Sequence, residues 1–179
     1  IQACIKLQEV TSNIKYLDFA KEITRFVIDN FMDEATGYFF FTHKNQQDII
    51  LRKKEVYDGA TPSGNSIMAE NLYYLSVVFD NTVWRQAADK ITSALAPAIL
   101  RHPTSFAIWA SLLLKYTFGI NELVITGNNF TSLRNEMLLK YLPEVILQCG
   151  GGGNSNFPML KGKNPGNETL IYWCRQYSC

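Results

Sequence analysis

The sequence predicts a mainly α-helical protein with a small α/β part at its carboxyl end. Through residues 14–32 and 63–118, apolar side chains recur at spacings of three and four, which is the period of amphipathic helices. From residue 121 onward the pattern changes to short β-prone runs on either side of one helix, which is typical of a βαβ unit with parallel strands. We therefore expect a helical part over residues 1–120 and a small α/β part over residues 121–179.

The first predicted helix covers residues 14–32, where apolar residues form one stripe and charged residues fill the other faces. Turn-forming residues at 33–37 end this helix. Two β-prone runs, residues 38–42 and 49–51, then enclose a polar stretch. This pattern predicts a short β-hairpin.

Three further helices are predicted before residue 120. The second helix covers residues 63–79; it is apolar on most sides, as an inner helix is, and Ser63 occupies its N-cap position. The third begins at Asn81, and Pro97 is expected to kink it or end it early. The fourth takes Thr104 as its N-cap and ends at Gly119.

The α/β part is predicted as a strand at residues 122–126, a helix at 131–141 and a second strand at 144–147. Because a helix separates the two strands, we expect them to be parallel. Residues 150–156 contain four glycines among polar residues and are expected to form a flexible loop. Residues 170–173 are a candidate third strand.

The overall composition bounds the class of protein. Hydrophobic residues make up 47% of the chain, enough for a substantial core, and the net charge is +1. A near-neutral chain gives no electrostatic case for nucleic acid or an anionic membrane, and no apolar run approaches the about 20 residues that span a bilayer. We therefore expect no nucleic-acid or membrane partner. The sequence shows no signal-peptide pattern, and we interpret the chain as a piece of a longer protein.

The four cysteines do not form a recognisable metal or redox motif. Only Cys174 and Cys179 lie close together in the sequence, and two ligands do not make a zinc site. They could form a disulfide, bind a metal with outside ligands or remain free thiols, and free thiols are expected. A chain of this size does not depend on disulfides, so reduced thiols and a cytoplasmic location are the default.

The most informative segment is Tyr57–Ser66, with the sequence YDGATPSGNS. It holds an acid, two glycines and a proline directly before the second helix, so it is built to keep a particular backbone shape. Asp58 near a helix N-terminus should stay ionised, which suits a base or a group that grips sugar hydroxyls. The alternative is structural: Asp58 caps backbone N–H groups and Asn65 braces the loop.

Residues 52–66, with the sequence RKKEVYDGATPSGNS, resemble the KE-x-YDGA-x-PSGNS signature of the DUF255, YyaL-like or spermatogenesis-associated 20-like family. The preceding GYFFFT at residues 37–42 and the later ELVITG at 122–127 are similar to the same proteins in order and spacing. The ending IYWC-x4-C at residues 171–179 resembles their C-terminal motif. The resemblance covers nearly the whole chain and identifies it as the C-terminal part of such a protein.

The resemblance implies an α/α toroid of the six-hairpin glycosidase type, akin to N-acylglucosamine 2-epimerases, beside an N-terminal thioredoxin-like domain that this chain lacks. Four or five helices are too few to close such a ring, so the toroid is expected to be incomplete, with exposed faces that favour self-association.

The leading functional hypothesis is a carbohydrate-directed domain with an epimerase-like or glycosidase-like cleft. Such chemistry needs an acid and a base at separate positions around the sugar, with aromatic faces and amides to bind it. Related epimerases use histidines, which makes His43 a better candidate than His102. The alternative is a non-catalytic binding or interaction module that accompanies the thioredoxin-like domain. No metal and no cofactor are expected; the expected catalytic residues are Asp58, Glu55 and His43, and the expected substrate-binding residues are Tyr57, Ser63 and Asn65.

Overall fold

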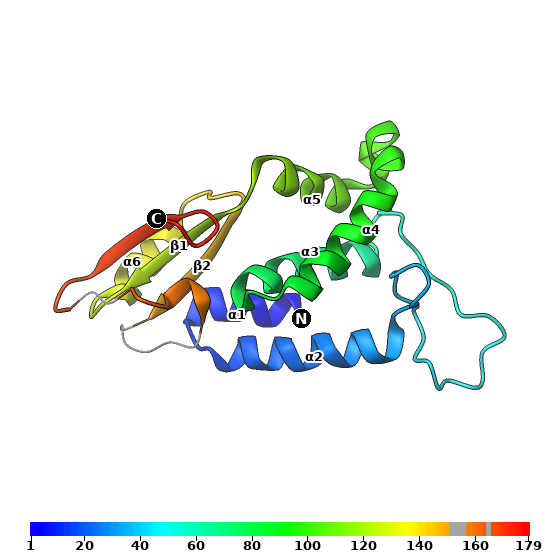
Figure 1. Cartoon of the computed structure of the whole chain (residues 1–179), viewed down its shortest axis with the longest axis horizontal. Helices are drawn as coiled ribbons and strands as arrows, with labels where there is room; N and C mark the ends of the chain where they lie inside the picture. Colours follow the sequence, from blue (N-terminus) through cyan, green and yellow to red (C-terminus); the bar gives the residue numbers. More distant parts are fainter. Residues whose placement is uncertain (151–156, 164–165) are drawn as a thin grey trace.

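The computed structural model describes residues 1–150, 157–163 and 166–179. Helices fill one end of the molecule and a small sheet the other (Figure 1), so the predicted mainly α-helical class with a small sheet is confirmed. The helices are α1 (Gln2–Thr11), α2 (Lys15–Phe31), α3 (Gly64–Phe79), α4 (Thr82–Arg101), α5 (Ala107–Phe118) and α6 (Phe130–Leu138); the strands are β1 (Asn121–Thr126), β2 (Val145–Gly150) and β3 (Leu170–Cys174); short 3₁₀ turns cover Pro103–Ser105 and Pro158–Leu160.

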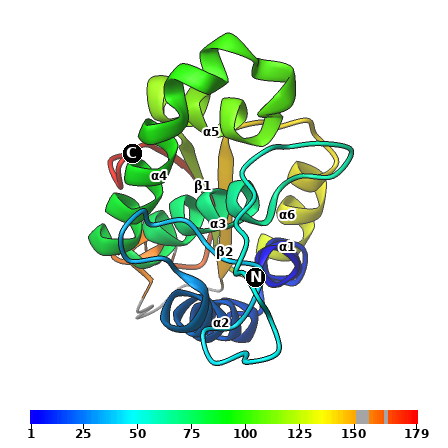
Figure 2. The same cartoon turned by 90° about the vertical axis from the view of Figure 1, so that its right-hand side faces the viewer.

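Helix α3 is the central helix. Figure 2 shows it between α1 and α2 on one side and α5 on the other, and most of its residues are buried. The Ser63 side chain caps it as predicted, because Ser63 Oγ accepts a hydrogen bond from the Ser66 backbone N–H at 3.0 Å. The expectation of an apolar inner helix over residues 63–79 is thus confirmed.

Helix α1 has no counterpart among the predicted helices. Its buried face contains two polar residues, Gln8 and Glu9, beside Cys4 and Ile5. This mixture hides the apolar period that signals a helix in the sequence. Helix α2, in contrast, lies within the residues 14–32 that were predicted.

Two predictions about α4 and α5 are corrected by the structure. Helix α4 contains Pro97 but continues to Arg101, so the early end that was one of the two expected effects of Pro97 is wrong; buried Ile99 lies in the last turn. Thr104 lies in a 3₁₀ turn and does not cap α5, which has no side-chain cap from its own N-cap residue. Gly119 ends α5 with a φ of 78°, a backbone conformation that suits glycine, as predicted.

The predicted β-hairpin at residues 38–51 is wrong. No strand is assigned there, and the one pairing is an isolated bridge between Met32 and Phe39. Both backbone polar groups of Phe39 bond to the Asn65 side chain: the N–H donates to Oδ1 at 2.6 Å and the carbonyl accepts from Nδ2 at 2.9 Å. These groups are therefore not available for a strand ladder.

The sheet has the order β2-β1-β3. Strands β1 and β2 pair in parallel with Leu123 opposite Leu147, so the predicted βαβ unit is confirmed. The candidate third strand is also confirmed, since β3 pairs antiparallel to β1. Of the predicted loop at residues 150–156, Gly150 ends β2 and the rest lies outside the described residues.

The hydrophobic core is continuous across residue 120. Helix α6 covers one face of the sheet, over Leu123 and Ile125. On the other face, Val124 and Ile146 belong to the same cluster as the buried residues of α3 and α4. The division into residues 1–120 and 121–179 stays a prediction.

In the described part of the chain, no helix combines the length and the apolar character needed to cross a membrane.

Candidate functional site

Asp58 lies in the interior, where it joins three backbone segments. Its side chain is 5% exposed. Oδ1 accepts from the Ser63 backbone N–H at 2.9 Å and from Ser66 Oγ at 2.6 Å, and Oδ2 accepts from the Ile108 backbone N–H at 2.9 Å. The carboxylate thus holds the start of α3 to the first turn of α5, whose own N-cap residue, Phe106, supplies no side-chain cap.

Asn65 and Ser63 are also buried and bonded within the protein. Asn65 is 1% exposed. Besides its two bonds to Phe39, its Nδ2 donates to the Glu55 carbonyl at 2.8 Å. These contacts are those of the structural interpretation of residues 57–66, in which Asp58 caps N–H groups and Asn65 braces the loop.

The side chains of the remaining expected site residues do not join this network, although the Glu55 carbonyl does. Glu55 and Tyr57 are exposed, and Glu55 Oε1 accepts from the backbone N–H groups of Val56 and Tyr57, each at 2.8 Å. His43 packs its ring edge-on to Phe31, with centroids 5.7 Å apart. The structure therefore does not gather the six expected residues around one cleft. Of the six, Asn65 lines a described cavity, an apolar one of about 180 Å³ beside Phe31 and Phe39.

A larger cavity, which we call the Glu144 cavity, lies between α1, α3, α5 and the start of β2. Its volume is about 350 Å³. Polar and aromatic side chains from distant parts of the sequence meet there. They include Lys6, Glu70, Asn71, Tyr73, Tyr74, Ser111, Lys115, Tyr141 and Glu144.

The charges of the Glu144 cavity come from two carboxylates, Glu70 and Glu144, and two lysines, Lys6 and Lys115. Lys6 is largely exposed and is paired with Glu9. Glu70 forms an ion pair with Lys115 that is largely shielded from solvent. Burial raises the pKa of the Glu144 carboxyl; the nearby Lys115 opposes this and the charge of Glu70 adds to it. Glu144 Oε2 is buried and has no hydrogen-bond partner among the described residues.

Asn71 contributes its side-chain amide to the lining of the Glu144 cavity. The residue is 4% exposed, and its side chain makes no hydrogen bond with any residue that the structure describes. Its polar atoms are not among the fully buried atoms without a partner, so they are accessible from the cavity. The Glu144 cavity therefore presents polar groups that the protein itself does not satisfy.

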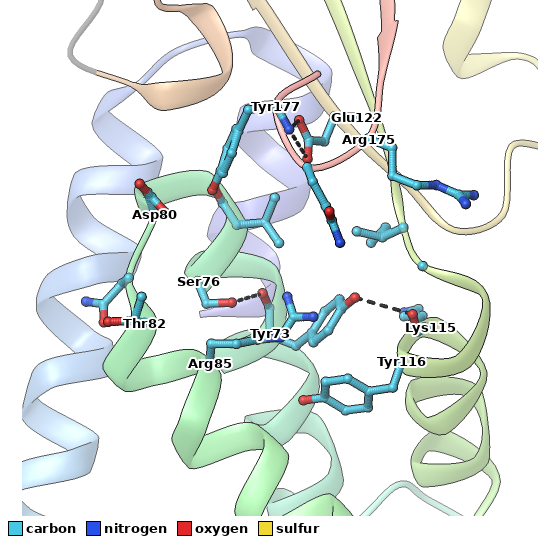
Figure 3. Close-up of a pocket in the computed structure, with 15 residues that line it drawn as sticks. Tyr73, Ser76, Asp80, Thr82, Arg85, Lys115, Tyr116, Glu122, Arg175 and Tyr177 are labelled. Atoms are coloured by element: carbon cyan, nitrogen blue, oxygen red, sulfur yellow. Dashed lines mark hydrogen bonds between the residues drawn. The ribbon is translucent and has the colours of Figure 1, made fainter. Parts of the chain in front are cut away.

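A second cavity, which we call the Tyr177 cavity, lies between the α3–α4 turn, the end of α5 and the C-terminal turn (Figure 3). Its volume is about 230 Å³, and it shares Tyr73, Lys115 and Ile120 with the Glu144 cavity. Tyr177 closes one side: its hydroxyl donates to the Val77 carbonyl at 2.6 Å.

The expectation of free thiols at Cys174 and Cys179 is wrong, because these residues form a disulfide. The five-residue separation folds the end of the chain back on itself, with a second closure by reciprocal backbone hydrogen bonds between Arg175 and Ser178. Cys4 and Cys149 are free and buried. Disulfides are typical of oxidising compartments, so this pair gives no support to the expected cytoplasmic location, which stays an expectation. No group of metal-binding side chains occurs in residues 1–150, 157–163 and 166–179.

The expected site residues do not include Glu70, Asn71, Lys115 or Glu144, which line the Glu144 cavity. These four come from three segments that lie up to 74 residues apart in the sequence, and no short motif links them. One local signal was present: Glu70 and Asn71 are adjacent polar residues within the largely apolar run at residues 67–79 of the second predicted helix.

The comparisons with known proteins agree with the resemblance seen in the sequence. No family model matches the chain. It is 24% identical over its whole length to the uncharacterized protein B0495.5 of Caenorhabditis elegans, and 22% identical over its whole length to human spermatogenesis-associated protein 20. The rat form of the latter is 24% identical over 88% of the chain. The chain spans 25%, 24% and 20% of these three relatives, about a quarter of their length. It is thus distantly similar to spermatogenesis-associated protein 20.

Proposed function

We propose that the chain is a carbohydrate-directed part of a longer spermatogenesis-associated 20-like protein, and that the Glu144 cavity is where a sugar binds. The observation that carries this proposal is the meeting of two carboxylates, two lysines and the Asn71 amide around one cavity of about 350 Å³. This assignment moves the site away from residues 55–66, whose buried polar groups are occupied within the protein.

The lining of the Glu144 cavity suits a ligand with many hydroxyl groups. Carboxylates accept hydrogen bonds from hydroxyls, and an amide such as Asn71 can both donate and accept. The rings of Tyr73, Tyr74 and Tyr141 supply apolar faces beside these groups. A few convergent polar groups in a partly aromatic pocket are the usual pattern of small-molecule sites.

The two carboxylates also suit acid–base chemistry on a sugar. The raised pKa of Glu144 favours its protonated form, which can donate a proton to an oxygen. Glu70, held by Lys115, is the matching acceptor. Epimerisation and glycoside hydrolysis both need such a pair, so an epimerase-like or glycosidase-like reaction is the finer form of the proposal.

We assign the helical hairpins α1–α2 and α3–α4 to an incomplete α/α toroid of the six-hairpin glycosidase type, as the DUF255-like resemblance implies. The lengths of the relatives support this, because about three quarters of each lies outside the match. The missing part of the ring would come from that remainder.

A second candidate is a non-catalytic interaction module. Two observations favour it: the internal bonding of residues 57–66, and the exposure of Phe19 and Phe26 on α2, each more than half exposed. Apolar side chains of this size on one helix can contact a partner or a second copy of the chain. In this case the chain would self-associate and no sugar would bind.

A thermal-unfolding screen of monosaccharides and sugar phosphates tests the sugar proposal. At least one sugar should raise the unfolding temperature of the wild-type chain, because a ligand of the folded state stabilises it. The shift should be lost in Glu144→Gln and in Asn71→Ala. Glu136→Gln on α6, an exposed carboxylate, is the matched control and should keep the shift.

The proposal fails if no sugar in the screen stabilises the wild type, or if both cavity variants respond as the control does. A concentration-dependent increase in mass by light scattering, with no response to sugars, would instead favour the interaction module.

A further inference from the structure

The Tyr177 cavity contains a buried carboxylate that forms no direct ion pair within the described residues. Glu122 is 2% exposed, and the backbone N–H of Tyr177 donates to both of its oxygens, at 3.2 and 3.1 Å. Burial raises the pKa of the Glu122 carboxyl, and the charge of Lys163 opposes this. Lys163 does not form an ion pair with Glu122, and no other described residue does. A buried carboxylate is normally paired with a cation, because it has lost the stabilisation by water.

The opposite side of the same cavity presents a guanidinium group. Arg85 lies over the rings of Tyr73 and Tyr116, at 4.1 and 5.3 Å from their centroids. Its closest acid is Asp89 at 3.6 Å, in a pair that is partly exposed. Figure 3 places Glu122 and Tyr177 on one side of the open space and Arg85 with the two rings on the other.

The other charged groups of the cavity are engaged elsewhere or exposed. Lys115 is paired with Glu70. Arg175 donates to Asn121 Oδ1 at 3.3 Å, and its guanidinium points away from the space between Arg85 and Glu122 in Figure 3. Asp80 is exposed at the end of α3. A negative group and a positive group therefore face a shared space from opposite sides.

We propose that the Tyr177 cavity binds a small zwitterion of the amino acid or dipeptide class, with its ammonium group at Glu122 and its carboxylate at Arg85. Each end would form a charge-assisted hydrogen bond, which is stronger than a neutral one. A volume of about 230 Å³ is suited to a molecule of this size. The site is separate from the proposed sugar site, since neither Glu122 nor Arg85 lines the Glu144 cavity.

The side of the Tyr177 cavity that would bind the ammonium group, formed by Glu122 and the C-terminal turn, is held in place by the protein itself. Tyr177, which bonds to Glu122 through its N–H, lies between the two cysteines of the Cys174–Cys179 disulfide. Its hydroxyl bond to Val77 ties the same turn to α3. A site held in this way loses little freedom when a ligand binds.

Isothermal titration calorimetry of the full chain with each protein amino acid and with alanyl-alanine tests the proposal. At least one of these zwitterions should bind the wild type. Its N-acetyl derivative lacks the ammonium group and its amide lacks the carboxylate, so each should bind at least about tenfold more weakly.

Two variants test which residue binds which end of the ligand. In Glu122→Gln the zwitterion and its N-acetyl derivative should bind alike, and in Arg85→Gln the zwitterion and its amide should bind alike. Arg101→Gln, at the far end of α4, is the matched control and should keep the wild-type preference. Because each comparison is made within one variant, a general loss of stability does not imitate the result.

The proposal is overturned if the wild type binds none of the zwitterions or does not distinguish them from their singly charged derivatives. It is also overturned if both variants keep the wild-type preference. If a variant does not fold, the affinities of the wild type for the zwitterion, its N-acetyl derivative and its amide still test the proposal. Failure here leaves the sugar proposal intact, since that proposal depends on Glu144 and Asn71.

Discussion

At the scale of single residues, the chain uses its most distinctive segment for structure. Asp58 receives hydrogen bonds from Ser63 at the α3 N-terminus and from Ile108 in the first turn of α5, which are 45 residues apart in the sequence. Sequence analysis recognised that Asp58 belongs near a helix start. It could not show that the second oxygen is occupied by Ile108, because that contact exists only after α5 has packed against the loop.

Replacing Asp58 with asparagine tests this structural role. Asparagine keeps the size but removes the charge and leaves one acceptor, so we expect a loss of about 1.5–3 kcal/mol in the free energy of unfolding, the range for hydrogen bonds to charged groups. Urea unfolding measures this change. Asp48→Asn is the control, since Asp48 is exposed. An Asp58→Asn protein as stable as the control would show that the carboxylate does not hold the two helices.

At the scale of elements, structure that depends on neighbouring residues was predictable from the sequence, whereas structure that depends on contacts between distant residues was not. Helix α3 was predictable because its apolar surface and its Ser63 cap lie in one continuous stretch. The hairpin prediction failed because Asn65, remote from the β-prone run, takes both backbone groups of Phe39. Helix α1 was not recognised because Gln8 and Glu9 lie on its buried face.

The C-terminal turn is the element whose stability depends most on covalent chemistry. Cys179→Ser opens the loop of the disulfide, and loop-closure entropy gives an expected cost of about 2 kcal/mol. Thermal unfolding with and without dithiothreitol measures it. The wild type should lose stability on reduction, whereas Cys179→Ser should be insensitive to the reductant. Equal unfolding temperatures for oxidised wild type and variant would contradict this expectation.

At the scale of the whole molecule, both described polar cavities form where the helices meet the sheet. The wall between them is made of Tyr73, Lys115 and Ile120, from α3, α5 and the link to β1. The sequence predicted the helical part and the βαβ unit separately. It could not predict the cavities, because their residues come together only when the continuous core joins the two parts.

The central claim is that the polar groups of the Glu144 cavity, and not those of residues 55–66, meet the ligand. The side-chain amide signals of Asn71 and Asn65 report on these two places in one NMR titration of the full chain, with the sugar that stabilises it most in the thermal screen. The account predicts that the Asn71 signal shifts and saturates while the Asn65 signal stays in place. A shift at Asn65 without one at Asn71 would contradict it.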